Sequence, residues 1–128
     1  MVRPSLEGRS ILIVEDQPLI ALDVAHALED AGAKVTTTNT LKHAVILAEQ
    51  DGLSGAILDH VLSDGDSTQL CSRLKERDIP FVIYSGYARV GGACQEGVHV
   101  SKPATPEHLV TVLAGLLLGA LKGSDPIQ

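Results

Sequence analysis

Short apolar runs separated by amphipathic segments recur along the chain, and this alternation limits the possible folds more than any other feature. Each apolar run has the length of a buried strand, and each intervening segment has the spacing of apolar residues found on one side of a helix. Strands that alternate with helices favour a parallel sheet covered by helices on both faces. The predicted strands are residues 10–14, 34–38, 55–59, 80–84 and 98–100.

The predicted helices connect these strands and follow the last one. The first begins at Pro18, which suits an initial helical turn, and stops at Gly32. The others are expected at residues 41–50, 66–77 and 105–122. The fold class is therefore α/β, with a doubly wound sheet of five parallel strands. At 128 residues, 45% of them hydrophobic, the chain is predicted to form one domain over residues 1–128 with a core at about 9–122, and no output domain is expected after the last helix.

Charge and composition exclude several classes of protein. Ten Lys and Arg residues against sixteen Asp and Glu residues give a net charge of -6, which disfavours nucleic-acid binding. The first ten residues lack the apolar core of a secretory signal, and the apolar stretch 109–121 is shorter than the about 20 residues that span a membrane. We therefore expect a cytoplasmic protein with no membrane partner. Cys71 and Cys94 have no CxxC spacing and are expected to be reduced thiols.

Charged or hydroxyl-bearing residues follow four of the five predicted strands. Glu15 and Asp16 follow the first, Asp59 ends the third, Ser85 follows the fourth and Lys102 follows the fifth. Turn capping or solvent exposure explains each of them when it is taken alone. In a parallel sheet, however, the carboxyl ends of the strands meet at one edge, where ligands bind. These residues are therefore predicted to converge on one cleft.

Such a cleft would hold more negative charge than its lysine can neutralise. Three carboxylates about 5 Å apart repel one another by roughly 3 kcal/mol per pair at an effective dielectric constant of 20. Lys102 offsets one charge, and Mg²⁺, which prefers carboxylate oxygens, suits the remainder. An aspartate in this setting can accept a phosphoryl group as an acyl phosphate. The Lys102 ammonium and the Ser85 hydroxyl would then contact the oxygens of that group.

This set of residues and its spacing resemble the receiver domain of two-component response regulators. Successive spacings of 43, 26 and 17 residues separate Asp16, Asp59, Ser85 and Lys102. The resemblance implies a flavodoxin-like (βα)5 fold with strand order 2-1-3-4-5. It also implies phosphorylation of Asp59 by a phosphohistidine of a partner histidine kinase, with Mg²⁺ on Asp16 and Asp59 and with Glu15 acting mainly through a water.

The sequence departs from the family pattern between the fourth and fifth strands. Only twelve residues, four of them glycine, separate Ser85 from Val98, so the fourth helix is expected to be shortened or disordered. His99 occupies the family's aromatic switch position, three residues before the lysine. A plain histidine at a strand end is the alternative interpretation. The Ser-Gly-Tyr sequence after the fourth strand resembles stand-alone receivers that pair with kinases of the HWE type.

Two further positions bear on how long a phosphoryl group would last. Val61 lies two residues after Asp59, and Tyr87 lies two residues after Ser85. In the family, side chains at these positions influence attack by water. Valine cannot orient a water by hydrogen bonding, and Tyr87 could shield the phosphoryl group. We therefore expect slow self-dephosphorylation.

The last predicted helix is apolar on nearly all sides between Leu109 and Leu121. Two interpretations stay open: a core helix with a few exposed leucines, or an exposed apolar patch that binds a partner or a second copy of the chain.

Three functions compete at this stage. The first is a signalling receiver that accepts phosphate and is no metabolic enzyme. The second is a receiver fold that no longer accepts phosphate and only docks on a kinase. The third, an aspartate phosphatase, is disfavoured because Val61 stands where such enzymes carry a second carboxylate.

Overall fold

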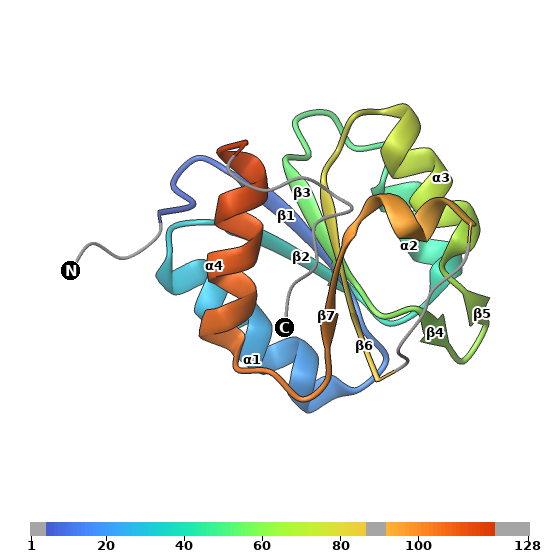
Figure 1. Ribbon diagram of the computed structural model, residues 1–128, viewed down its shortest axis with the longest axis horizontal. Coiled ribbons are helices and arrows are strands. Elements are labelled where there is room, and N and C mark those ends of the chain that lie inside the picture. The colour runs from blue at the N-terminus through green and yellow to red at the C-terminus, as the bar shows by residue number, and fades with distance from the viewer. Residues whose placement is uncertain (1–4, 87–91, 120–128) are drawn as a thin grey trace.

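The computed structural model describes residues 5–86 and 92–119, which form a parallel sheet between two layers of helices (Figure 1). The strand order in the sheet is β2-β1-β3-β6-β7. The elements are β1 (Ser10–Val14), α1 (Pro18–Asp30), β2 (Lys34–Thr38), α2 (Leu41–Leu47), β3 (Gly55–Leu58), β4 (Val61–Leu62), β5 (Gly65–Asp66), α3 (Thr68–Glu76), β6 (Phe81–Ser85), the 3₁₀ turn η1 (Gly92–Glu96), β7 (Val98–Ser101) and α4 (Pro106–Leu117).

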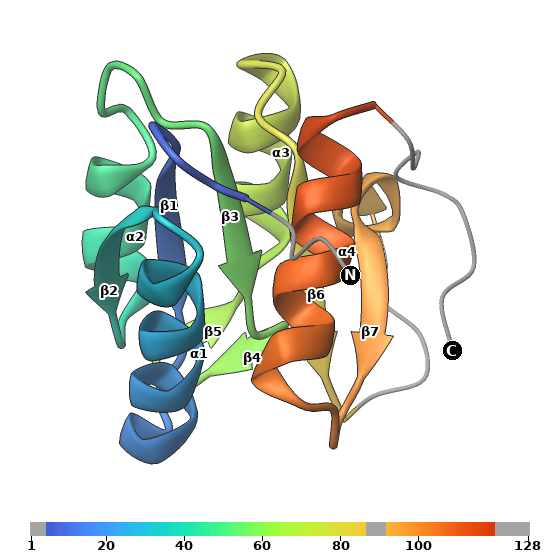
Figure 2. The same cartoon turned by 90° about the vertical axis from the view of Figure 1, so that its left-hand side faces the viewer.

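The two faces of the sheet are covered by different helices. α1 and α4 lie on one face, and α2, α3 and η1 lie on the other (Figure 1). A separate apolar core fills each layer, because successive side chains of the buried strands point to opposite faces. All strand pairs of this sheet are parallel, so the strands end at one common edge (Figure 2).

The α/β class and the strand order agree with the sequence prediction, since β6 and β7 are the fourth and fifth strands of the sheet. The sequence did not predict the small antiparallel hairpin β4-β5, which follows β3. Asp64 lies in the turn of this hairpin. Its side chain accepts hydrogen bonds from the first backbone N–H groups of α2, at Leu41 (3.0 Å) and Lys42 (3.2 Å). The loop after β3 is thereby tied to α2.

The predicted shortening of the fourth helix is confirmed within the described residues, where a five-residue 3₁₀ turn precedes β7. Gly97 ends this turn against β6, and a Cβ atom there would overlap the Phe81 ring. This close approach requires glycine at position 97.

The described part of the last helix is a core helix, which agrees with the first of its two interpretations. Thr105 caps α4 by accepting a hydrogen bond from the His108 N–H (3.1 Å). The apolar side chains of α4 pack against α1 and the sheet, and only Leu118, just beyond its end, is largely exposed. Leu121 lies outside the described residues. The buried residues of α4 are Leu109, Val110, Val112, Leu113 and Ala114.

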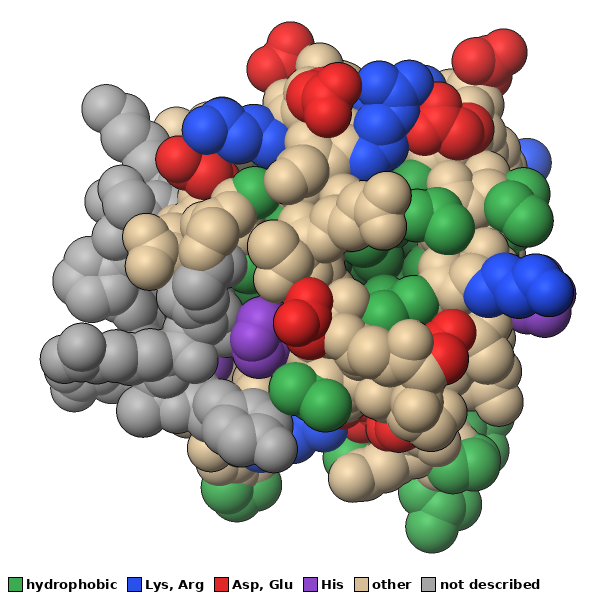
Figure 3. Space-filling view, turned by 90° about the vertical axis from the view of Figure 1, so that its right-hand side faces the viewer, with side chains coloured by type: hydrophobic (Ala, Val, Ile, Leu, Met, Phe, Trp, Pro, Cys, Tyr) green, Lys and Arg blue, Asp and Glu red, His purple; other side chains and the backbone are tan. Residues whose placement is uncertain are grey.

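None of the helices in residues 5–86 and 92–119 is both long enough and apolar enough to cross a membrane. On the face over α2, α3 and η1, side chains of opposite charge lie next to one another (Figure 3). Two ion pairs, Arg73 with Glu49 (2.5 Å) and Lys75 with Glu96 (2.9 Å), connect the elements of this face.

The prediction of two reduced thiols is wrong, because Cys71 and Cys94 form a disulfide. Cys71 lies in α3 and Cys94 in η1, and packing of η1 against α3 brings their Cα atoms to 5.1 Å. Both side chains are fully buried. The pairing depends on tertiary packing between segments 23 residues apart, which the cysteine spacing alone does not reveal.

Reduction of this disulfide should destabilise the protein. Closing a loop of this length in the unfolded chain corresponds to about 3 kcal/mol of stability. We expect dithiothreitol to lower the free energy of unfolding of the wild type by about that amount, measured in urea. The Cys71→Ser/Cys94→Ser variant should not respond to the reductant. Two reactive thiols in the wild type, titrated in urea without reductant, would contradict the assignment.

Candidate functional site

The ends of β1 and β3 bring three carboxylates together. Val14, the last residue of β1, accepts a hydrogen bond from the Asp59 N–H (2.8 Å), and the Glu15 N–H donates to the Thr38 carbonyl (3.0 Å). Backbone pairing therefore continues past both strands and fixes where the acidic side chains start. One carboxylate oxygen from each of Glu15, Asp16 and Asp59 lies within 4.8 Å of the others. The predicted convergence of these carboxylates is confirmed.

Lys102 reaches into this acidic cluster from the end of β7. Its Nζ atom lies 2.9 Å from Glu15 Oε1 and 3.3 Å from Asp59 Oδ2. The Lys102 N–H donates to the Ser85 carbonyl (2.9 Å), so backbone pairing between β6 and β7 also continues to this point. Ser85 itself is fully buried. The lysine thus bridges two carboxylates that the sequence separates from it by 87 and 43 residues.

The electrostatics of the cluster favour a bound cation. Burial, as the largest cause, and the hydrogen bond to Asp59 together raise the pKa of Glu15 to about 7, against the opposing effect of Lys102. Burial lowers the pKa of the Lys102 ammonium, but its hydrogen bond and charge interactions with Glu15 and Asp59 outweigh burial and raise that pKa overall. The site therefore holds more carboxyl groups than its one lysine can neutralise.

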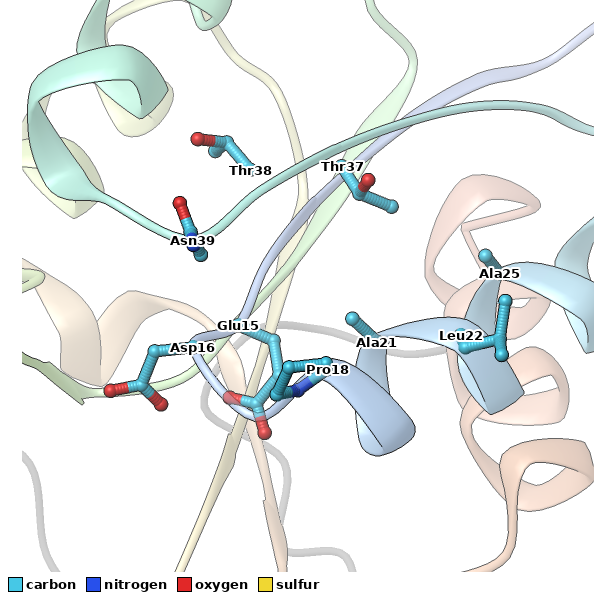
Figure 4. Close-up of a pocket in the computed structure, with 9 residues that line it drawn as sticks. All are labelled: Glu15, Asp16, Pro18, Ala21, Leu22, Ala25, Thr37, Thr38 and Asn39. Carbon is cyan, nitrogen blue, oxygen red and sulfur yellow. The ribbon is translucent and has the colours of Figure 1, made fainter.

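The acidic cluster remains accessible to solvent on the side of α1. Asp16 is partly exposed, and the Asp59 residue keeps 9% of its surface. A neighbouring pocket of about 370 Å³ is bordered by Glu15 and Asp16, by the start of α1 and by the end of β2 (Figure 4). A pocket therefore lies beside two of the three residues of the acidic cluster.

The donor set fits a hard divalent cation. Carboxylate oxygens are the ligands that Mg²⁺ prefers, and this cluster offers one from each of three residues. The buried Oε2 atom of Glu15 has no hydrogen-bond partner within the described part of the chain. A buried acceptor of this kind is normally satisfied by water or an ion. Glu15, Asp16 and Asp59 are thus the residues that could hold a metal.

Two buried hydroxyl groups that the sequence did not single out support the reactive side chains. Ser67, directly before α3, donates its hydroxyl to the Asp59 carbonyl (2.5 Å) and its N–H to the His60 carbonyl (2.8 Å). The Tyr84 hydroxyl is hydrogen-bonded to the backbone of Ala104, just beyond Lys102. The polar residue directly before a helix could have indicated Ser67, whereas no sequence signal indicates the contacts of Tyr84.

Two of the three predicted modulating residues, Val61 and His99, lie in the described part of the chain, in different settings. Val61 is 42% exposed on β4. His99 is partly buried on β7, opposite Ile83 of β6, and its Nε2 atom has no hydrogen-bond partner among the residues described. Tyr87 lies outside the described residues, so its position is not given by the structure.

A comparison with models of known protein families identifies the family of this chain. The model of the response regulator receiver domain matches residues 11–114. The chain belongs to this family. It is also 31% identical over 114 residues to the phyllosphere-induced regulator PhyR of Methylorubrum extorquens. That alignment covers 84% of the chain but 43% of PhyR, so the chain spans less than half of this relative.

Solved receiver structures share the fold of this chain. A response regulator receiver protein from Sinorhizobium medicae has 26% sequence identity and a TM-score of 0.78, over 91% of this chain and 100% of that one. The solution structure of SdrG from Sphingomonas melonis Fr1 has 36% identity and a TM-score of 0.72, over 85% and 96% of the two chains. The predicted flavodoxin-like receiver fold is therefore confirmed.

The raised pKa of Glu15 predicts that the metal-free protein loses stability as the pH rises. Between about 4.5 and 7, the folded carboxyl holds a proton that the unfolded chain has released. The contribution of the protonated Glu15 carboxyl to folding stability is fully present below pH 4.5 and is lost as the pH rises through about 7. Between pH 5 and 8 in EDTA, we expect a loss on the order of 2 kcal/mol in the free energy of unfolding, measured in urea.

The Glu15→Gln variant is the control for this measurement, because it keeps the shape of the side chain and cannot titrate. Its stability should change less with pH than that of the wild type. Equal pH dependence in the two proteins would show that Glu15 is not protonated in the folded state.

Proposed function

We propose that the protein is a signalling receiver whose Asp59 accepts a phosphoryl group from a phosphohistidine of a partner histidine kinase, in the presence of Mg²⁺. The observation that carries this proposal is the position of Lys102 Nζ between Glu15 and Asp59, beside a third carboxylate on Asp16. Membership of the receiver family supports it.

Each reactive side chain has a separate role in the proposed transfer. A carboxylate oxygen of Asp59 attacks phosphorus, the bond from phosphorus to the histidine nitrogen breaks, and an acyl phosphate forms. The Lys102 ammonium and the Ser85 hydroxyl are proposed to contact the phosphoryl oxygens. Glu15, Asp16 and Asp59 would hold Mg²⁺, with Glu15 acting mainly through a water. When bound, the ion supplies positive charge that stabilises the transferring group.

The proposed partners follow from the same function. A histidine kinase, of the HWE type according to the Ser-Gly-Tyr sequence, would supply the phosphoryl group, and contact with another protein would carry the signal onward. A cytoplasmic location is part of the proposal, and neither a nucleic-acid nor a membrane partner is proposed.

Incubation with acetyl phosphate and Mg²⁺ tests the proposed function. We expect the intact mass of the wild type to rise by one phosphoryl group. The Asp59→Asn variant should gain no mass, because an amide is not a nucleophile for phosphorus. Asp51→Asn, at an exposed position outside the site, should behave as the wild type does.

The other outcomes distinguish the competing functions. No mass gain in the wild type would favour a docking module that does not accept phosphate. Equal gains in the wild type and Asp59→Asn would place the phosphoryl group on another residue. Continuous phosphate release from added monoesters would instead indicate a phosphatase.

The phosphorylated protein should lose its phosphoryl group slowly, because the apolar Val61 cannot orient an attacking water. Val61→Asn introduces a hydrogen-bonding group and should speed the loss about tenfold, a fraction of what full acid-base assistance provides. The rate is measured by intact mass after removal of the phosphodonor. Ser63→Asn, also exposed in the β4-β5 hairpin, should leave the rate unchanged. A half-life of seconds in the wild type that Val61→Asn lengthens would contradict this prediction.

A further inference from the structure

We propose that Tyr84 is a positioning residue for Lys102: its hydroxyl and its ring hold the lysine between Glu15 and Asp59. Tyr84 is the second-last residue of β6, directly before Ser85, and its side chain is buried in the core under α1 and α4. With Glu15 and Asp59 it also lines a small cavity of about 10 Å³ below the acidic cluster. It therefore lies next to the site without belonging to the groups assigned to the chemistry.

The hydroxyl fixes the chain just beyond the lysine. It donates a hydrogen bond to the Ala104 carbonyl (3.0 Å) and accepts one from the Ala104 N–H (3.0 Å). Ala104 comes two residues after Lys102, where β7 has ended and the strand ladder no longer holds the backbone. A side chain that satisfies both polar groups of one backbone residue takes the place of that ladder.

The ring acts on the lysine side chain itself. The Lys102 Nζ atom lies 5.3 Å from the centre of the Tyr84 ring, within the range of cation–π attraction. The same Nζ atom lies 2.9 Å from Glu15 Oε1 and 3.3 Å from Asp59 Oδ2. The ammonium group therefore interacts with an aromatic ring as well as with two carboxylates.

The hydroxyl separates this role from simple core packing. A phenylalanine would fill the same volume and keep the ring near Lys102, yet it could form neither bond to Ala104. Tyr84→Phe therefore removes the hydrogen bonds to the Ala104 backbone and keeps the packing of the ring. If Tyr84 only fills the core, this substitution should leave Lys102 unaffected.

The reactivity of Lys102 toward an amine-specific acylating reagent tests the positioning role directly. At trace reagent, with labelled peptides quantified by mass spectrometry, we expect labelling of Lys102 to rise about fivefold in Tyr84→Phe, the factor that one typical net hydrogen bond represents. Lys34 and Lys42, both exposed, serve as internal references and should not change. Val98→Ala, a core substitution at the far end of β7, controls for general loss of stability.

Two outcomes overturn the positioning role. One is unchanged labelling of Lys102 in Tyr84→Phe. The other is an equal rise in Val98→Ala, which would mean that any loss of core stability exposes the lysine.

A second readout rests on the proposed function. The rate of phosphorylation by acetyl phosphate at saturating Mg²⁺ should fall about fivefold in Tyr84→Phe, again by the size of one net hydrogen bond. The Mg²⁺ affinity should be retained, because no carboxylate has changed. An unchanged rate, with the wild type phosphorylated, would contradict the role of Tyr84 in transfer. A wild type that is not phosphorylated at all would refute the proposed function, and the labelling result would still decide the positioning role.

Discussion

The ammonium group of Lys102 determines how this site can be assembled. Glu15 and Asp59 are mostly buried, and two carboxylates about 5 Å apart repel by roughly 3 kcal/mol at an effective dielectric constant of 20. The lysine lies within hydrogen-bonding distance of both, at 2.9 and 3.3 Å. Without it, the ends of β1 and β3 would place like charges together with no compensating group. One lysine cannot balance three carboxylates, and the remaining negative charge would favour a cation at this site.

The parallel sheet makes this arrangement possible. Its central strands β1, β3 and β6 are buried along nearly all of their length. Because all strand pairs of the sheet are parallel, the residues after each strand lie at one edge. Backbone hydrogen bonds continue the pairing for one residue beyond the strands, at Asp59 and at Lys102. Beyond the paired strands, buried hydroxyl groups form hydrogen bonds with the backbone: Ser67 with the Asp59 carbonyl, and Tyr84 with Ala104. The site is thus rigid at its base and open toward solvent near Asp16.

The acidic cluster could be predicted because it follows from local patterns, whereas the strand order was implied by the resemblance to receiver domains. Apolar runs identify strands, and polar residues at strand ends must share an edge once the strands are parallel. The contacts of Ser67 and Tyr84 could not be predicted, because they join segments that only the tertiary fold brings together. The Cys71–Cys94 bond was missed for the same reason. α4 was left ambiguous because periodicity cannot tell a helix buried against both α1 and the sheet from one with an exposed apolar face.

Direct binding of Mg²⁺ is the measurement that tests the central claim, that the carboxylates after β1 and β3 form one cation site. In a titration followed by ¹H–¹⁵N NMR, we expect saturable one-to-one binding with the largest shifts at Glu15, Asp16, Asp59 and Lys102. Asp16→Asn should weaken that binding strongly while the spectrum stays folded. Shifts spread over the surface without saturation, or binding unaffected by Asp16→Asn, would show that these carboxylates do not form one cation site.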